Sequence, residues 1–385
     1  MVGRHAHPGG RGRWAATAGV ALVLIVGGAL FFTGGRALRA SVTTTSAVPV
    51  ATTSTTTTTT TTTTTPPTVT IAAVGDTELG NTPQLPPDPT AYLGAMKSAL
   101  AAPIVFGNLE GTITDLTTSK CAVKSIYCYA FRVPTSYAHV YRAAGFTVLN
   151  SANNHAYDFL QAGANATTAA LRAAGIVQAG LPDQIGVVRD GTLKVAFVDF
   201  APYYNTNNML NQSAADQLIA RAHQLANVVV VYMHAGAEGP SAAHVTRATE
   251  TFVGENRGNP YAFAHAAIDA GADLVVASGP HVLRGLEWYH GHLIDYSLGD
   301  FVNYYNFATI GDLRLSAILH VTLDGTGSFT SGHFTSLVLE PSGAAQLDPT
   351  QSAATFVNQL SKQDFGAAAA IIQPDGTISL PTSQG

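Results

Sequence analysis

Short apolar runs alternate with alanine-rich stretches along most of the chain. The alanine-rich stretches 137–144, 165–174 and 261–270 have the composition of helices and separate several β-branched runs of strand length. Strands that alternate with helices predict an α/β fold with a binding site beyond the carboxyl ends of the strands. The predicted strands span residues 69–74, 104–106, 147–149, 193–200, 228–233 and 274–277.

The pattern changes after Gly291, where apolar runs follow one another without helices between them. These runs lie at 293–296, 315–323 and 336–339 and predict further strands. We therefore place the folded domain at residues 69–340 and expect residues 341–385 to form a C-terminal tail.

Polar side chains follow the early strands at the point where each strand ends. Because the carboxyl ends of parallel strands meet at one edge of a sheet, we expect these side chains to lie together. Imidazole suits Zn, Fe or Mn, and carboxylate suits harder ions, so the set predicts a divalent metal site. The segments are GDTE at 75–78, GNLE at 107–110, ANNH at 152–155, HAGAE at 234–238 and SGPH at 278–281.

These segments resemble motifs of the CapA family, the capsule-synthesis proteins associated with poly-γ-glutamate. GPHVLRGLE at 279–287 and YSLGDF at 296–301 extend the resemblance, which covers roughly residues 70–339. The family resemblance implies a calcineurin-type metallophosphoesterase domain, built as a four-layer α/β/β/α sandwich. It also implies one or two divalent ions, which would be Mn, Fe or Zn.

The resemblance assigns roles to individual residues. His155 would be the catalytic proton donor. Apart from the resemblance, the planar guanidinium forks of Arg284 and Arg257 could hold an anionic substrate, with Asn153 beside them; a surface ion pair is the alternative for Arg257. The expected metal ligands are Asp76, Asn108, Glu110, Asn154, His234 and His281.

The sequence departs from the phosphoesterase pattern at three places. Glu78 replaces the histidine of Asp-x-His, and Asp300 replaces the asparagine of SLGN. The segment ending at His281 keeps only one histidine of Gly-His-x-His. These departures leave open whether the centre holds one ion or two. Glu78 and Asp300 could each be a substitute ligand or a solvated loop residue.

Two functions remain open at this point. The first is a metal-dependent hydrolase that acts on a capsule, poly-γ-glutamate or other cell-envelope polymer. The alternative is a non-catalytic polyglutamate-binding component that works with other subunits of a membrane synthesis or export complex. Adhesion alone would leave the polar strand ends unexplained.

The segment 15–32, AATAGVALVLIVGGALFF, has no charged residue and no proline. About 18 apolar residues are just enough to cross a bilayer as a helix. Arginines are slightly more numerous before the segment than after it, so we expect residues 1–14 to stay in the cytoplasm. This predicts a single-pass signal anchor in the cell membrane with the bulk of the chain extracytoplasmic. A signal peptide cleaved near residues 37–40 is the alternative.

Residues 33–68 are expected to form a disordered linker. Threonine is unbroken from Thr55 to Thr65, and Pro66-Pro67 follows. Such a tract has no apolar face to bury and is typical of an O-glycosylated stalk.

Charge and cysteine content narrow the picture further. The net charge of −5 offers no basic face for nucleic acid, so we expect none to bind. The two cysteines, Cys121 and Cys128, predict a local disulfide outside the cytoplasm. Half of a zinc site is the alternative, but a second pair of ligands is not close in sequence.

Overall fold

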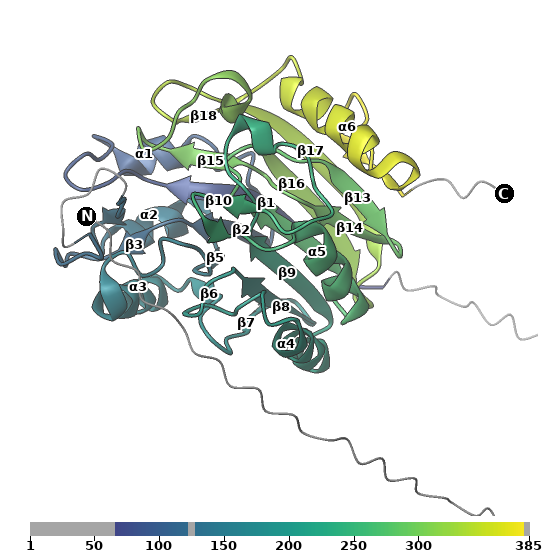
Figure 1. Cartoon of the computed structure of the whole chain (residues 1–385), viewed down its shortest axis with the longest axis horizontal. Helices are drawn as coiled ribbons and strands as arrows, with labels where there is room; N and C mark the ends of the chain where they lie inside the picture. Colours follow the sequence, from purple (N-terminus) through teal and green to yellow (C-terminus); the bar gives the residue numbers. More distant parts are fainter. Residues whose placement is uncertain (1–65, 122–127, 381–385) are drawn as a thin grey trace, which may run out of the picture. The chain divides into compact units, whose positions relative to one another are not determined.

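The computed structural model describes residues 66–121 and 128–380 (Figure 1). The expected anchor at 15–32, the N-terminus before it and nearly all of the 33–68 linker lie outside these described residues. Among the described residues, the helices are all too short or too polar to span a bilayer.

The first sheet has nine strands and mixes parallel and antiparallel pairs. Its order is β18-β17-β16-β1-β2-β5-β6, with β15 beside β1 and β19 beside β17. The strands β1, β2, β5 and β6 are parallel to one another, whereas β16, β17 and β18 run antiparallel. The bounds are β1 Thr68–Glu78, β2 Ile104–Leu109, β5 Val148–Asn150, β6 Val177–Ala179, β15 Asp300–Asn303, β16 Leu315–Asp324, β17 Phe329–Leu339, β18 Ala345–Leu347 and β19 Thr377–Ile378.

The second sheet has six strands in the order β13-β14-β12-β9-β8-β7. Its four inner strands are parallel, and the edge strands β7 and β13 are antiparallel to their neighbours. The bounds are β7 Gly186–Asp190, β8 Leu193–Phe200, β9 Val228–His234, β12 Leu274–Ser278, β13 Leu286–Tyr289 and β14 His292–Asp295.

Alternating side chains of the two sheets build three layers of apolar packing. Val195 and Phe197 of β8 face the first sheet, whereas Ala196 and Val198 face helices, as expected for strands buried on both faces. The helices α1 (Pro89–Gly94), α2 (Tyr137–Ala144) and α3 (Leu160–Ala173) cover the first sheet. The helices α4 (Gln212–Leu225) and α5 (Pro260–Asp269) cover the second. The predicted mixed α/β fold is confirmed, with two sheets packed between helices.

Residues after 340 belong to the domain instead of forming a tail. The strands β18 and β19 both pair with β17, and helix α6 (Ser352–Phe365) packs on β13, β16 and β17 (Figure 1). Val357 and Leu360 of this helix are buried. The boundary expected at residue 340 is therefore corrected, because the apolar face of α6 covers the end of the inter-sheet core.

Strand register places the polar strand ends side by side. Asp76 of β1 is level with Asn108 of β2 on one side and with Asp300 of β15 on the other. Asn108 is in turn level with Asn150 of β5. In the second sheet, His234 of β9 is level with Ser278 of β12. The fold thus collects at one edge residues that lie far apart in sequence.

The packing between the sheets should depend strongly on Phe106. Its ring stacks on Phe197 of the opposite sheet, with 5.1 Å between the ring centroids. The centroid of the Tyr232 ring lies 5.3 Å away. Phe106→Ala should therefore lower the free energy of unfolding by about 3–5 kcal/mol, measured by denaturant titration. Val253→Ala is the control, because Val253 is 82% exposed. A loss below about 1 kcal/mol at Phe106 would contradict this view of the core.

Asp199 of β8 should make stability depend on pH. Both its carboxylate oxygens are buried without a hydrogen-bond partner among the described residues, and burial raises the pKa of Asp199 well above its usual range. The folded protein therefore keeps this proton, and its contribution to stability is lost as pH rises from about 4 toward the folded pKa, at about 1.4 kcal/mol per pH unit. At pH 7 the free energy of unfolding of Asp199→Asn should be larger than that of wild type. The difference should shrink toward pH 4. An equal difference at both pH values would refute this.

Candidate metal centre

Glu110 lies at the centre of the strand-end cluster. It follows β2 directly and is 1% exposed, and neither of its carboxylate oxygens has a hydrogen-bond donor among the described residues, although the buried carboxyl group of Glu78 lies against it. Its Oε1 is 3.6 Å from His234 Nε2, 3.8 Å from His281 Nε2 and 4.0 Å from His155 Nε2. These distances are too long for hydrogen bonds. Three imidazoles thus surround a buried carboxylate without satisfying it.

Asp76 joins this cluster from β1. Its carboxylate accepts hydrogen bonds from Asn108 Nδ2 at 2.7 Å, from the Ser278 hydroxyl and from the Gly279 amide. Burial raises the pKa of Asp76 to about 6, against the opposing effect of His281. These contacts hold the carboxylate in place at the point where β1 meets β12.

Two candidate ligand groups share Asp76. One contains Asp76, His281 and Asp300, and the other contains Asp76, Glu110 and His234. Within each group, one potential ligand atom per residue lies within 4.8 Å of the others. A cation would give a partner to Glu110, whose buried carboxyl group otherwise has no hydrogen-bond donor among the described residues. The residues present therefore fit a divalent metal.

A chain of side-chain amides fixes the orientation of Asn108. The oxygens of Asn150 and Asn153 accept hydrogen bonds from backbone amides, so their NH₂ groups must be the ones that face Asn108. They donate to Asn108 Oδ1 at 2.6 and 2.9 Å, which turns the NH₂ group of Asn108 toward Asp76 and His234. An amide NH₂ is not a metal ligand, so the role expected for Asn108 is corrected: it is a donor that orients Asp76.

His234 comes from the end of β9 in the second sheet. Burial, together with the positive charge of Arg257, lowers the pKa of His234 well below its usual range. The ring is therefore neutral, which is the form of histidine that binds metals. Because Asn108 Nδ2 faces Nδ1 of His234 at 3.2 Å, the neutral ring carries its proton on Nε2, which is buried without a hydrogen-bond partner among the described residues.

His281 is held between carboxylates. Its Nδ1 is 2.8 Å from Asp300 Oδ1 and 3.4 Å from Asp76 Oδ2, and its ring stacks on Phe307. Burial acts to lower the pKa of His281, but Asp300 and Asp76 more than reverse this and raise it to about 10. Asp300 is thus a buried partner of His281 and not a solvated loop residue. The sequence alone is compatible with either role.

Glu78 is also buried and has no hydrogen-bond partner for either oxygen among the described residues. Burial raises the pKa of Glu78 well above its usual range, and the charges of Asp300 and Asp76 add to this effect. Like Asp300, Glu78 is therefore part of the acidic cluster and not a solvated residue.

His155 lies on the first-sheet side of the cluster, in the loop after β5. Its Nδ1 is 2.7 Å from Asp158 Oδ2, so Nδ1 carries the proton and Nε2 is directed toward Glu110. Burial lowers the pKa of His155, although Asp158 acts to raise it. Asp158 was not among the predicted site residues. Its signal was present in the sequence as the third residue after His155 in ANNHAYD.

The residues expected to bind substrate have structural partners. Arg284 is fully buried, and its guanidinium contacts both carboxylate oxygens of Glu250, at 2.7 and 3.2 Å. Arg257 contacts Glu238 at 3.0 Å and donates to the backbone oxygen of Gly236. These contacts use the planar fork that an anionic substrate would need. The structure thus gives both arginines a role in holding the loop after β9.

The two asparagines before His155 differ in their surroundings. Asn153 donates to Asn108 Oδ1 and to the Leu109 carbonyl, and it accepts from the His155 amide. These bonds leave it as an organiser of the loop and not a substrate contact. Asn154 Oδ1 is buried without a partner among the described residues, and its ligand role stays a prediction.

The fold and the site together define a mixed α/β protein with a candidate divalent-metal centre at its strand ends. The sequence profile of the family described as bacterial capsule synthesis protein PGA_cap matches residues 70–305. The chain belongs to this family, as its resemblance to CapA proteins predicted.

Two curated relatives of this chain are CapA proteins. The PGA biosynthesis protein CapA of Bacillus subtilis (strain 168) is 31% identical over 246 residues, which are 60% of this chain and 60% of that protein. The capsule biosynthesis protein CapA of Bacillus anthracis is 29% identical over 183 residues, covering 42% of this chain and 41% of that protein. The chain thus matches less than two thirds of the length of either relative.

Similarity to solved structures is weaker. A 5'-nucleotidase precursor from Thermus thermophilus matches with a TM-score of 0.37 and 13% identity, over 77% of this chain and 59% of that one. A purple acid phosphatase from yellow lupin (Lupinus luteus) seeds matches with a TM-score of 0.36 and 10% identity, over 74% of this chain and 53% of that one. Both scores are low, and the family assignment rests on the sequence match.

Glu110→Gln keeps the size and shape of the side chain at the candidate metal centre and removes its ability to ionise. Metal content after Zn²⁺ or Mn²⁺ loading should fall at least tenfold, because the variant lacks the carboxylate common to the three imidazole contacts. Without metal, the same variant should melt at a higher temperature than wild type at pH 7, because burial raises the pKa of Glu110 well above its usual range and glutamine needs no proton to be buried. Glu255→Gln is the control on the exposed strand β11 (Glu255–Asn256). Equal metal content in wild type and Glu110→Gln would exclude Glu110 as a ligand.

Proposed function

We propose that this CapA-family protein is a metal-dependent hydrolase of metallophosphoesterase type that acts on a capsule, poly-γ-glutamate or other cell-envelope polymer. The observation that carries the proposal is the buried Glu110 carboxylate, which lacks a partner among the described residues while three imidazole nitrogens lie 3.6–4.0 Å away. Buried polar groups in proteins are normally hydrogen-bonded, so an unsatisfied buried carboxylate among imidazoles favours a bound ligand at this point.

The residues best suited to hold one or two ions of Mn, Fe or Zn are Asp76, Glu110, His234, His281 and Asp300. Such an ion supplies Lewis-acid polarisation of a phosphoryl or carbonyl oxygen and lowers the pKa of water. The protein then has to orient the substrate and move protons.

His155 is the residue we assign to proton transfer. Its Nδ1–H is fixed by Asp158, which leaves Nε2 as the atom that accepts or releases a proton. Because burial lowers the pKa of His155, the neutral ring is the resting form. A neutral imidazole can take a proton from the attacking water and return it to the leaving group.

The charge of the site bears on the alternative, a non-catalytic polyglutamate-binding component. Asp76, Glu78, Glu110, Glu238 and Asp300 gather there, and the nearby Arg257 is already paired with Glu238. An anionic polymer would be repelled by these carboxylates unless cations neutralised them. The metal-loaded hydrolase accounts for this acidity better than a metal-free binding site does.

We further propose that residues 15–32 anchor the protein in the cell membrane, with the Thr-rich stretch as a stalk and the bulk of the chain extracytoplasmic. The apolar length of this segment and the arginines before it support this. In this position the site would face envelope polymer, and other subunits of a synthesis complex could lie beside it.

His155→Ala tests the catalytic role. Turnover should fall by about a hundredfold or more for substrates with a poor leaving group, such as an alkyl phosphate or the γ-glutamyl polymer. The loss should be smaller for a nitrophenyl ester, whose leaving group needs no proton. Metal content should stay near that of wild type. His333→Ala on the exposed face of β17 is the control.

Normal turnover by His155→Ala on every substrate would remove its assigned role. If the metal-loaded wild type turned over neither phosphoesters nor polymer, the binding-component alternative would replace the hydrolase.

A further inference from the structure

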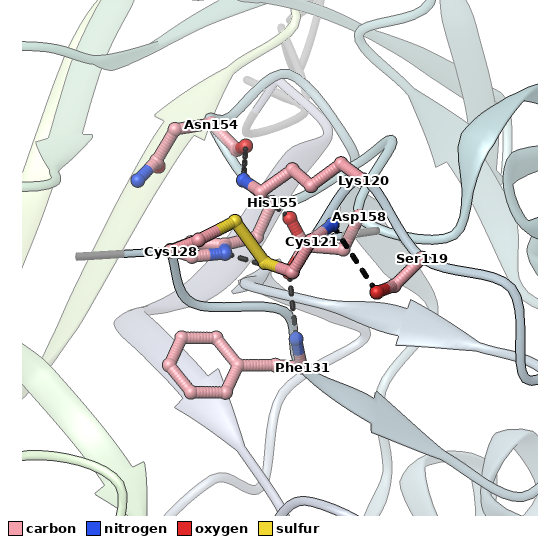
Figure 2. Close-up of a disulfide and its surroundings, with 8 residues drawn as sticks. All are labelled: Ser119, Lys120, Cys121, Cys128, Phe131, Asn154, His155 and Asp158. Atoms are coloured by element: carbon pink, nitrogen blue, oxygen red, sulfur yellow. Dashed lines mark hydrogen bonds and ion pairs between the residues drawn. A yellow bond between two sulfur atoms is a disulfide. The ribbon is translucent and has the colours of Figure 1, made fainter. Parts of the chain in front are cut away.

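The residues on either side of the disulfide, Lys120 and Phe131, both reach the pair formed by His155 and Asp158. The predicted bond between Cys121 and Cys128 is confirmed. Lys120 directly precedes the first cysteine, and Phe131 lies three residues after the second. Figure 2 shows both residues beside the pair formed by His155 and Asp158.

The flank before Cys121 binds Asp158 through its backbone and its side chain. Lys120 donates its backbone amide to the Asp158 carbonyl at 2.7 Å, and its Nζ lies 2.6 Å from Asp158 Oδ1. The same ammonium group donates to the Asn154 carbonyl at 3.2 Å (Figure 2). Lys120 therefore bridges the two sides of the turn that carries His155.

The flank after Cys128 holds the same pair from another direction. The Phe131 backbone amide donates to Asp158 Oδ2 at 2.6 Å, and this is the oxygen that accepts from His155. The Phe131 ring lies against the His155 ring, with 4.6 Å between the ring centroids. One flank thus orients the carboxylate and the other also packs on the imidazole.

The carbonyl of Phe131 also accepts hydrogen bonds from the Thr112 amide and hydroxyl, at 3.1 and 3.0 Å. The short strands β3 (Thr112–Ile113) and β4 (Arg132–Val133) pair at the base of the segment that contains the disulfide, and no regular secondary structure lies between them among the described residues. The disulfide joins the two flanks above that base. A cross-link of this kind limits the conformations open to the segment.

We propose that the Cys121–Cys128 disulfide, with Lys120 and Phe131, is a positioning element that keeps the His155 imidazole in the tautomer and orientation set by Asp158. These residues do not touch the reacting atoms, and they act through His155. The expected effect on turnover rests on the proposed hydrolase function. The effect on the His155 ring does not.

The test uses full-length protein loaded with Zn²⁺ and compares wild type with the double variant Cys121→Ser/Cys128→Ser. The ¹⁵N shifts of the His155 ring nitrogens should show one tautomer, protonated at Nδ1, in wild type. The double variant should show averaged shifts from mixed tautomers, with metal content within about twofold of wild type. Its kcat should fall about tenfold or more with little change in KM, because a displaced catalytic group slows the chemical step.

Lys120→Met keeps the disulfide and removes the ammonium contacts, so it should shift the His155 signals in the same direction by a smaller amount. Lys97→Met, at an exposed lysine of the same domain, is the matched control and should leave them unchanged. If the double variant does not fold, Lys120→Met decides the question.

The proposal would be overturned if the double variant folded and its His155 ring-nitrogen shifts were those of wild type. If the double variant does not fold, wild-type shifts in Lys120→Met would overturn it. If the metal-loaded wild type has no hydrolytic activity, the hydrolase function fails, while the tautomer measurement still decides the positioning role.

Discussion

Buried negative charge between two sheets is the constraint on which this structure depends. Asp76, Glu78, Glu110 and Asp300 lie within one cluster and are almost fully enclosed. Enclosing carboxylates destabilises a fold unless protons, donors or cations compensate. Asn108, Ser278 and the Gly279 amide satisfy Asp76, and His281 bridges toward Asp300. Glu110 is left without such partners among the described residues, and a cation would supply the missing compensation.

Both sheets are needed to build the site. Asp76, Glu110 and His155 come from strand ends of the first sheet, whereas His234 and His281 follow strands of the second. The distances between these groups are therefore set by the apolar layer between the sheets, where Phe106 stacks on Phe197. Packing and chemistry are linked, because a change in sheet separation would move the two halves of the ligand set apart.

The sequence predicted the parts of the site that depend on strand order. Asp76, Glu110, His234 and His281 were expected together because each follows a predicted strand, and the structure brings them together. The sequence could not predict how the side-chain amide of Asn108 is oriented. That orientation depends on Asn150 and Asn153 and on their backbone donors. Arg284 was misjudged for a similar reason, since its partner Glu250 lies on a distant loop. The sequence predicted a tail after residue 340, because the apolar face of α6 is recognisable as part of the core only where it packs on β13 and β17.

The sharing of Asp76 between two ligand groups has a consequence for how ions would fill the centre. A carboxylate that serves both positions makes their occupancies interdependent, and the coupling free energy is the same whichever position fills first. The first ion would neutralise part of the acidic cluster, so the second would meet a weaker field. Such a centre fills stepwise, with one tight and one weaker position. The number of bound ions would then rise with metal concentration in two separate steps.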